Sequence, residues 1–185
     1  MFSQPRGYVW HYTVASHLPA IAQSGGLHPS RTQLNPVDAA RAILWFSRQQ
    51  QWEPSVPRPE IHVRQTHGGR SLRLEPGLYR FGLPQGDMRL LPWPAITRVA
   101  ELEVPEAMTM VSGGLRHGAT PTDWLGTLAA VPVADLRFQA WDGHAWIDAD
   151  LHAAELASRR ASKVDQPPAA RRAPQALALA SHDVF

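Results

Sequence analysis

The most informative stretch of the sequence spans residues 8–26 and reads YVWHYTVASHLPAIAQSGG. Its first part is rich in β-branched and aromatic residues, which favour a strand. In its second part Leu18 and Ile21 keep helical spacing, and Ser16 is placed to cap the helix. Gly25 or Gly26 can adopt the left-handed conformation that ends a helix. We therefore expect a strand, a short helix and a glycine stop.

Three further segments carry the patterns of strands. One is a short apolar run suited to a buried strand, and the other two alternate between apolar and polar residues. The dipeptide Asp142-Gly143 joins the last of them to residues 144–147, which is the sequence signal of a β-hairpin. The three segments are residues 41–47, 78–83 and 136–141.

Helices are expected at two other places. Residues 93–100 carry proline in the first turn, where its missing N–H is tolerated, and residues 148–162 are rich in alanine. We expect a long loop over 48–76 with an edge strand at 61–64, and a turn over 121–128. Strands and helices in this mixture predict an α+β fold.

The composition indicates one folded domain followed by a tail. The chain has 185 residues, of which 44% are hydrophobic and 18% are charged, a balance typical of globular proteins. We expect residues 1–160 to form a single domain. Residues 161–185 contain Pro167-Pro168 and Arg171-Arg172, and we expect them to form a disordered basic tail.

Several kinds of site are excluded by the residues present. Because the chain has no cysteine, disulfides, thiolate metal sites and cysteine nucleophiles cannot form. The histidines form no zinc-hydrolase motif, and the Gly-x-Ser-x-Gly and Gly-rich phosphate-loop motifs are missing, so we expect no metal site. Without a signal-peptide pattern or a long apolar run, we expect a cytoplasmic protein, or one exported without a cleaved signal.

Two strings in the first part of the chain carry the functional signal. HYTVASHLPAIAQSGGLHPS, residues 11–30, is followed by ILWFS, residues 43–47. Together they resemble the N-terminal half of the ADP-ribosyltransferase superfamily. The most similar members are compact bacterial proteins, including DNA-targeting toxins of toxin–antitoxin systems and RNA 2′-phosphotransferases. The resemblance covers roughly residues 8–53.

The resemblance implies a fold, a substrate and a set of binding residues. The fold is a split, strongly bent β-sheet that holds NAD⁺ in the cleft between two small sheets. The histidine of the first strand would bond the adenosine ribose, and the backbone after it would lie near the nicotinamide amide. An aromatic pair would form the wall beside the nicotinamide, and two serines would lie near a ribose or phosphate and beside the catalytic acid. In this order, the residues are His11; Tyr12 and Thr13; Trp45 and Phe46; Ser30 and Ser47.

The sequence leaves the catalytic acid open. Cleavage of the nicotinamide–ribose bond builds positive charge on the sugar, so a carboxylate is needed near the ribose 2′-hydroxyl. In the family this acid usually lies on a late strand, and here the late strand at 137–141 carries Gln139 at the plausible position. The alternatives are Glu53, Glu101 and Glu103, and the last two lie in a stretch that could itself be the late strand.

Three functions are compatible with the resemblance. The first is transfer of ADP-ribose from NAD⁺ to a protein or nucleic acid, as in toxins, effectors and defence proteins, for which an antitoxin or immunity protein would be a partner. The second is recognition of NAD⁺, ADP-ribose or a terminal phosphate without turnover. The third is RNA 2′-phosphotransfer, for which Arg31, Arg41 and Arg48 are the nearby cations.

Each candidate residue also has a purely structural interpretation. His11 can be a hydrogen-bonded packing residue, and Trp45 and Phe46 can be core residues of a buried strand. Ser30 can be a turn residue, and Gln139 can face solvent on an alternating strand. The positions of these side chains relative to a cleft decide between the two interpretations.

Overall fold

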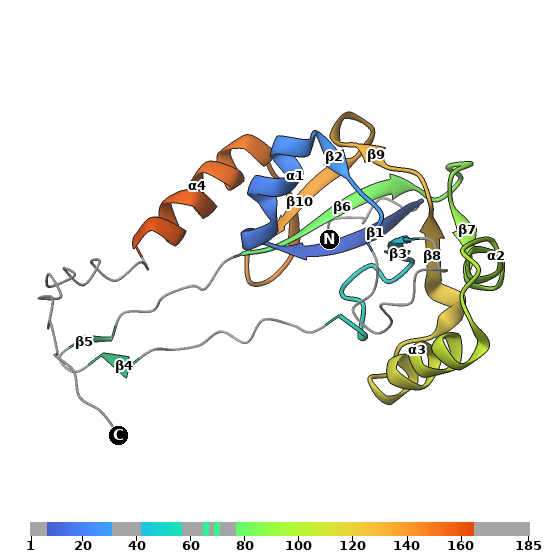
Figure 1. Ribbon diagram of the computed structural model, residues 1–185. Helices are drawn as coiled ribbons and strands as arrows, with labels where there is room; N and C mark the ends of the chain where they lie inside the picture. Colours follow the sequence, from blue (N-terminus) through green and yellow to red (C-terminus); the bar gives the residue numbers. More distant parts are fainter. Residues whose placement is uncertain (1–6, 31–41, 57–64, 67–68, 71–76, 165–185) are drawn as a thin grey trace, which may run out of the picture.

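Strand β1 (Tyr8–Val14) lies in the middle of a seven-stranded sheet in the computed structural model (Figure 1). The structure describes residues 7–30, 42–56, 65–66, 69–70 and 77–164. Every pair of neighbouring strands in this sheet is antiparallel. With four helices, the described residues form an α+β domain, as expected from the sequence. In sheet order the strands are β11 (Trp146–Asp148), β10 (Arg137–Trp141), β6 (Leu78–Pro84), β1 (Tyr8–Val14), β3 (Leu44–Ser47), β8 (Trp124–Thr127) and β7 (Leu91–Pro92).

The sheet is narrow at one place, between β1 and β3. Strand β1 pairs with β6 along its whole length, from Tyr8↔Pro84 to Val14↔Leu78. With β3 it pairs only at Trp10↔Ser47. We call this junction the seam. It divides the sheet into a part built on β1, β6, β10 and β11 and a part built on β3, β8 and β7.

The first segment follows its sequence closely. Strand β1 leads into the 3₁₀ helix η1 (Ala15–His17) and then α1 (Leu18–Ser24). Gly25 has a left-handed φ of 71° and its N–H bonds to the carbonyl of Ala22, which ends the helix as predicted. The predicted cap is wrong, because Ser16 lies inside η1 and no side chain caps either helix.

The four helices lie towards two ends of the sheet (Figure 1). Helix α1 packs against α4 (Leu151–Val164), and α2 (Trp93–Val99) packs against β7 and β8. Both α2 and α4 confirm the expected helices. Helix α3 (Val104–Arg116) lies at the same end as α2.

Helix α3 corrects the expectation that residues 100–105 could form a late strand. Glu101 has a φ of 57° and lies in the turn after α2. Glu103 is the N-cap residue of α3, and proline occupies the first turn of that helix. Both acids are exposed. A proline there cannot donate to a strand ladder, but it fits a helix start without loss.

Strand β8 corrects the expected turn over residues 121–128. The turn is limited to the 3₁₀ helix η2 (Pro121–Asp123), and the four residues of β8 are all buried between β3 and β7. A glycine in the middle weakens the strand pattern of the sequence. It is required by packing, since a Cβ at Gly126 would lie 2.7 Å from Ile43 Cγ2 and 2.9 Å from Ile96 Cγ1.

The predicted hairpin is confirmed. Strand β10 pairs with β11 from Gln139↔Asp148 to Trp141↔Trp146. Between them Asp142 Oδ1 accepts hydrogen bonds from the backbone N–H groups of His144 (2.7 Å) and Ala145 (2.8 Å). Gly143 takes a φ of 105°, which a side chain would disfavour.

Two small sheets complete the described strands. Strand β2 (Gly26–Leu27) pairs with β9 (Val131–Pro132), which leads into η3 (Val133–Asp135), and β4 (Gln65–Thr66) pairs with β5 (Gly69–Arg70). The expected edge strand at 61–64 lies outside the described residues, as does the tail from 165 onward. Helix α4 continues to Val164, past the expected domain boundary at 160.

Apolar side chains form separate clusters around β1. The largest cluster joins the strands to α1 and β2, and an aromatic cluster lies under the loop after β3. The first consists of Val9, Leu18, Leu27, Leu44, Phe46, Phe81, Leu83, Leu125, Val131 and Phe138, and the second of Trp10, Tyr12, Trp52 and Trp146. No helix among the described residues is long and apolar enough to cross a bilayer.

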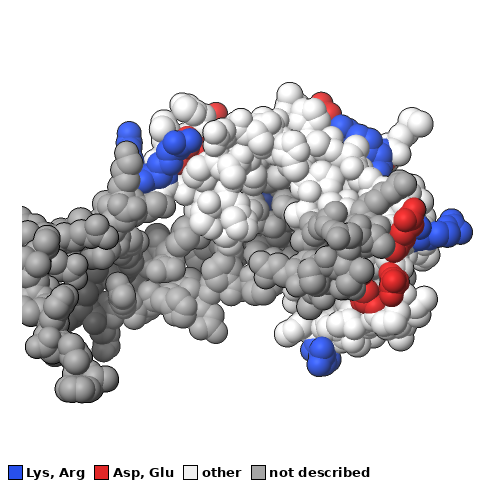
Figure 2. All heavy atoms as spheres, viewed as in Figure 1, with Lys and Arg blue, Asp and Glu red and all other residues white. Residues whose placement is uncertain are grey.

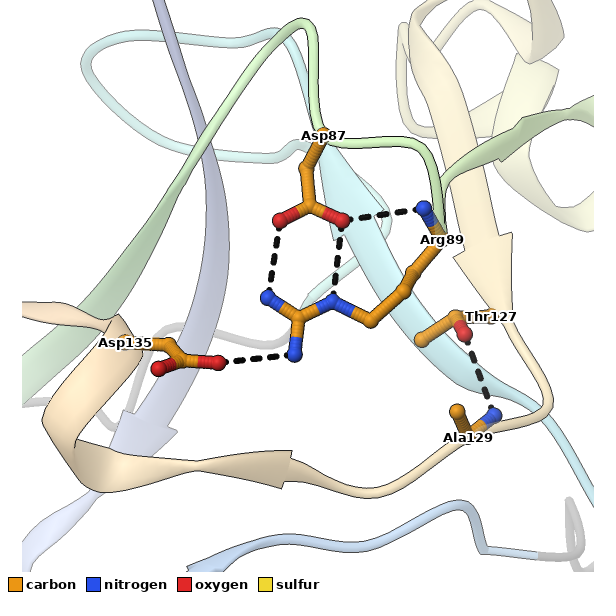
Figure 3. A network of polar contacts seen from close by, with 5 residues as sticks. All are labelled: Asp87, Arg89, Thr127, Ala129 and Asp135. Atoms are coloured by element: carbon orange, nitrogen blue, oxygen red, sulfur yellow. Dashed lines mark hydrogen bonds and ion pairs between the residues drawn. The ribbon is translucent and has the colours of Figure 1, made fainter.

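A polar network holds the connection between β6 and β7 (Figure 3). Arg89 bonds both carboxylate oxygens of Asp87, at 2.9 and 2.7 Å, and its Nη1 lies 2.8 Å from Asp135 Oδ2. Asp135 belongs to η3, so the network ties two connections that are distant in sequence. The side chains are partly exposed, so we expect the network to contribute little to the free energy of unfolding.

Candidate functional site

A cavity of about 500 Å³ lies beside the seam, between β1, β3, the loop after β3 and α3. It brings together six of the residues singled out in the sequence. The six are His11, Tyr12, Trp45, Phe46, Ser47 and Glu53. The pocket thus combines an imidazole, aromatic walls, a hydroxyl and a carboxylate.

The other candidates do not line this cavity. Thr13 is buried, with its Oγ1 3.2 Å from His17 Nδ1. Ser30 is exposed and forms an isolated bridge with Ile43. Gln139 belongs to a separate buried network, and Glu101 and Glu103 lie on the surface near the start of α3.

His11 is held in one tautomer by a bond across the seam. Its Nδ1 lies 2.9 Å from the carbonyl oxygen of Trp45. Since a carbonyl only accepts, Nδ1 carries the hydrogen and Nε2 is left as an acceptor. Burial lowers the pKa of His11, and nearby His17 lowers it further against the opposing effect of the bond to Trp45. The imidazole is therefore neutral at physiological pH.

Glu53 places a carboxylate in the cavity wall. The residue is only 4% exposed. Its Oε1 accepts hydrogen bonds from Ser55 Oγ (2.8 Å), Ser55 N (3.3 Å) and Trp124 Nε1 (3.1 Å). Its Oε2 accepts from Ser47 Oγ. Because Oε2 has one protein donor among the described residues, it retains capacity to accept a hydrogen bond from a ligand.

Ser47 connects β3 to this carboxylate. Its hydroxyl donates to Glu53 Oε2 and accepts the backbone N–H of Gln49 at 3.1 Å. The residue is 3% exposed and pairs with Trp10 at the seam. A serine beside the acid is the arrangement that the resemblance implies for this position.

Trp45 carries a buried donor, its indole Nε1, without an acceptor among the described residues. Its ring packs against Trp93 with centroids 5.6 Å apart. An unpaired buried N–H destabilises the protein by roughly 1–3 kcal/mol.

Gln139 is buried, which corrects the expectation that it could face solvent. It is 3% exposed, and its Oε1 accepts two hydrogen bonds from Arg80, at 2.8 and 2.6 Å. Its Nε2 donates to Asp148 Oδ1 at 2.9 Å. The amide is therefore occupied by neighbouring side chains on the sheet.

The cavity also contains residues that sequence reasoning missed, chiefly from α3. They are Thr109, Met110, Gly113, Gly114 and His117 of that region, together with Trp10, Ser55, Val56 and Trp124. Proline in the first turn and the apolar residues Met108, Val111 and Leu115 at helical spacing could have revealed the helix. Its approach to β3 depends on tertiary packing, which no local pattern reports.

Charged groups other than Glu53 contribute little to the described lining. Arg48 donates from Nη1 to the carbonyl of Thr122 at 2.6 Å and does not line the cavity, while Arg31 and Arg41 lie outside the described residues. Within the described ranges, no group of His, Asp or Glu could hold a metal ion. Figure 2 shows one face of the molecule, on which the Lys and Arg side chains are spread over both ends and do not gather in one patch.

Comparison with known proteins adds no relative to this geometry. No family model matches the chain, no curated protein matches it, and no solved structure matches it.

Proposed function

We propose that this protein binds NAD⁺ in the cavity beside the seam and transfers ADP-ribose to a macromolecular acceptor, with Glu53 as the catalytic carboxylate. One observation carries the proposal. The carboxylate of Glu53 lies in the same cavity as His11, and Ser47 donates a hydrogen bond to it. These are the three chemical groups that the resemblance requires in one place.

The chemistry assigns a role to each group. Loss of nicotinamide builds positive charge on the ribose, and a carboxylate fixed nearby lowers the energy of that transition state. Oε2 of Glu53 would accept a hydrogen bond from the 2′-hydroxyl of the ribose that carries nicotinamide. Nε2 of neutral His11 would accept a hydrogen bond from a hydroxyl of the adenosine ribose. The aromatic rings of Trp45 and Phe46 would stack against the nicotinamide.

One further observation supports this assignment. The narrow seam, with a single register pair between β1 and β3, supports a split sheet with the substrate at the division, which is the fold of the ADP-ribosyltransferase superfamily.

RNA 2′-phosphotransfer receives less support. That reaction needs several cations around a phosphate, and the described lining residues include neither lysine nor arginine. The acceptor is a protein or a nucleic acid, and an antitoxin or immunity protein would be the natural partner of such an activity.

The test is calorimetric titration with NAD⁺, with nicotinamide release followed in the same samples. We expect Glu53→Gln to lower the release rate by about 100-fold while changing the Kd for NAD⁺ by less than about threefold. His11→Ala should raise that Kd by about tenfold, since it removes one buried hydrogen bond. Thermal unfolding of each variant verifies that the fold is retained.

Glu103→Gln is the matched comparison, because it makes the same change at an exposed acid outside the cavity. Its release rate should equal that of the unmodified protein. Loss of release in Glu103→Gln but not in Glu53→Gln would overturn the assignment of the acid. Binding without release in the unmodified protein would indicate a recognition module, and no binding would overturn the proposed function.

A further inference from the structure

The chain between Ser47 and Glu53 is held by side chains from the sheet through three successive backbone carbonyls. Tyr12 Oη donates to the carbonyl of Gln49 at 2.5 Å. Arg80 Nη1 donates to the carbonyl of Gln50, and Trp146 Nε1 donates to that of Gln51 at 2.7 Å. We call residues 49–51 the carbonyl segment. Its donors come from β1, β6 and β11, so the segment is fixed from three strands.

The side chain of Gln50 adds bonds to the same segment. Its Oε1 accepts from Trp10 Nε1 at 3.0 Å. Its Nε2 donates to the carbonyls of Tyr8 (3.0 Å) and Arg48 (2.8 Å). Both its backbone and its side chain are therefore bound, which restricts the path of the chain on its way to Glu53.

Arg80 is the central donor, and it is fully buried. Its guanidinium lies between two indole rings, 3.8 Å from the centroid of Trp10 and 4.5 Å from that of Trp146. Such stacking favours a cation. Burial lowers the pKa of Arg80 to about 10, with Tyr12 acting in the opposite direction, so it remains charged at neutral pH.

Gln139 determines the direction of this guanidinium. Its Oε1 accepts from both Nε and Nη2 of Arg80, which leaves Nη1 directed at the carbonyl of Gln50. Asp148 holds the amide of Gln139 from the other side. A planar fork bound along one edge has a fixed orientation, which lysine could not reproduce.

A buried cation is costly, and an apolar side chain would fill the same space without that cost. The guanidinium of Arg80 instead donates hydrogen bonds to the side-chain amide of Gln139 and to the backbone carbonyl of Gln50. Core packing alone does not need these directional bonds, which restrict the position of the carbonyl segment.

We infer that Arg80, Gln139 and Trp146 are positioning residues that fix the carbonyl segment and thereby hold the carboxylate of Glu53 in the cavity. The catalytic part of this inference rests on the proposed function. Gln139, which the sequence offered as a catalytic residue, acts through Arg80 in this arrangement. A role in stability alone would not confine the effects of a substitution to one place. A positioning role predicts a lower rate of turnover and a change confined to the carbonyl segment and its neighbours.

The experiment uses Trp146→Phe, which removes the donor to Gln51 and keeps an aromatic ring, and Gln139→Leu, which releases the guanidinium. We expect each to lower kcat for nicotinamide release by at least about tenfold, with KM for NAD⁺ changed by less than about threefold. Trp141→Phe is the control, because this residue packs on Trp146 with centroids 5.3 Å apart and, among the described residues, does not donate to the carbonyl segment.

Hydrogen exchange of the protein without NAD⁺ gives a second readout that does not depend on activity. The N–H groups of Gln49 and Val56 are bonded to Ser47 Oγ and to the carbonyl of Glu53. They should exchange faster in Trp146→Phe and Gln139→Leu than in the control, with the rest of the sheet unchanged.

The outcomes separate the two proposals. Unchanged exchange in both variants overturns the positioning role, whether or not the protein cleaves NAD⁺. Faster exchange with unchanged kcat also overturns it, because the segment would then be held without consequence for turnover. If the unmodified protein releases no nicotinamide, the proposed function fails. Faster exchange in the variants would then still support the conclusion that Arg80, Gln139 and Trp146 fix the carbonyl segment.

Discussion

His11 and Tyr12 are neighbours on β1 whose polar atoms are kept in defined states by their surroundings. Burial lowers the pKa of His11, and the carbonyl of Trp45 selects the Nδ1–H tautomer. Burial raises the pKa of Tyr12 to about 12, so its hydroxyl remains a donor to Gln49 at any physiological pH. One strand thus supplies an acceptor to the cavity and a donor to the carbonyl segment.

The lowered pKa of His11 predicts a pH dependence of stability. The unfolded chain takes up a proton near pH 6.5, whereas the folded chain does so only at lower pH. The contribution of His11 to the unfolding free energy therefore has its full value above pH 6.5, and it decreases as the pH falls from there towards the folded pKa. His11→Asn keeps a donor for Trp45 but has no titrating group.

Urea unfolding at about pH 8 and about pH 5.5 tests this prediction. The unmodified protein should lose more unfolding free energy between the two pH values than His11→Asn does. The other histidines are common to both proteins and cancel in the comparison. An equal loss in both would mean that burial of His11 does not penalise its protonation.

At the scale of elements, α3 closes the cavity with two adjacent glycines of opposite character. A Cβ on Gly114 would lie 2.5 Å from Trp124 Cη2 and Cζ2, whereas a Cβ on Gly113 would meet nothing within 4 Å. Gly114 thus lets the indole of Trp124 approach the helix. From that position Trp124 donates to Glu53, so the helix and the acid are linked through one ring.

The two glycines give a matched pair of substitutions. Gly114→Ala should lower the unfolding free energy by about 1–3 kcal/mol, because Trp124 must move. Gly113→Ala should leave it unchanged or raise it by up to about 1 kcal/mol, because alanine favours the helical conformation more than glycine does. Urea unfolding midpoints measure both, and equal effects would contradict the close contact between α3 and Trp124.

At the scale of the whole molecule, helix α4 is hydrogen-bonded to η1, the short helix that directly follows β1. Ser158 Oγ of α4 donates to the carbonyl of Ala15 in η1 at 2.7 Å, between residues 143 positions apart. Figure 1 shows α4 beside α1 at one end of the sheet, far from the α2 and α3 end. The part of the sheet that carries β1 is therefore covered by helices from both ends of the described chain.

Ser158→Ala tests the contribution of this long-range contact. It removes a buried donor and leaves a buried carbonyl, so we expect a loss of about 1–2 kcal/mol in unfolding free energy. Ser112→Ala is the control, since its exposed hydroxyl donates to the carbonyl of Thr109 within α3. The control should change stability by less than about 0.5 kcal/mol. Similar values for both would show that the α4 contact adds no stability.

Patterns within a few residues predicted much of the fold. The β1–α1 unit with its stop at Gly25, the Asp142-Gly143 hairpin and helices α2 and α4 all follow from spacing, turn residues and proline position. Strand β8 and helix α3 did not. Gly126 interrupts the apolar pattern that would have predicted strand β8. A glycine is needed at this position because Ile43 and Ile96, which are distant in sequence, pack against it.

The sequence by itself therefore predicted most of the local elements, and its resemblance to a known superfamily grouped His11, Trp45, Phe46 and Ser47, which lie on β1 and β3. Only the tertiary structure decided which candidate acid joins them. Glu53 enters the cavity because Trp124 and the donors to the carbonyl segment hold it there, while Gln139 is bound to Arg80. These contacts join residues far apart in the chain, and their free energy exists only when the sheet has formed.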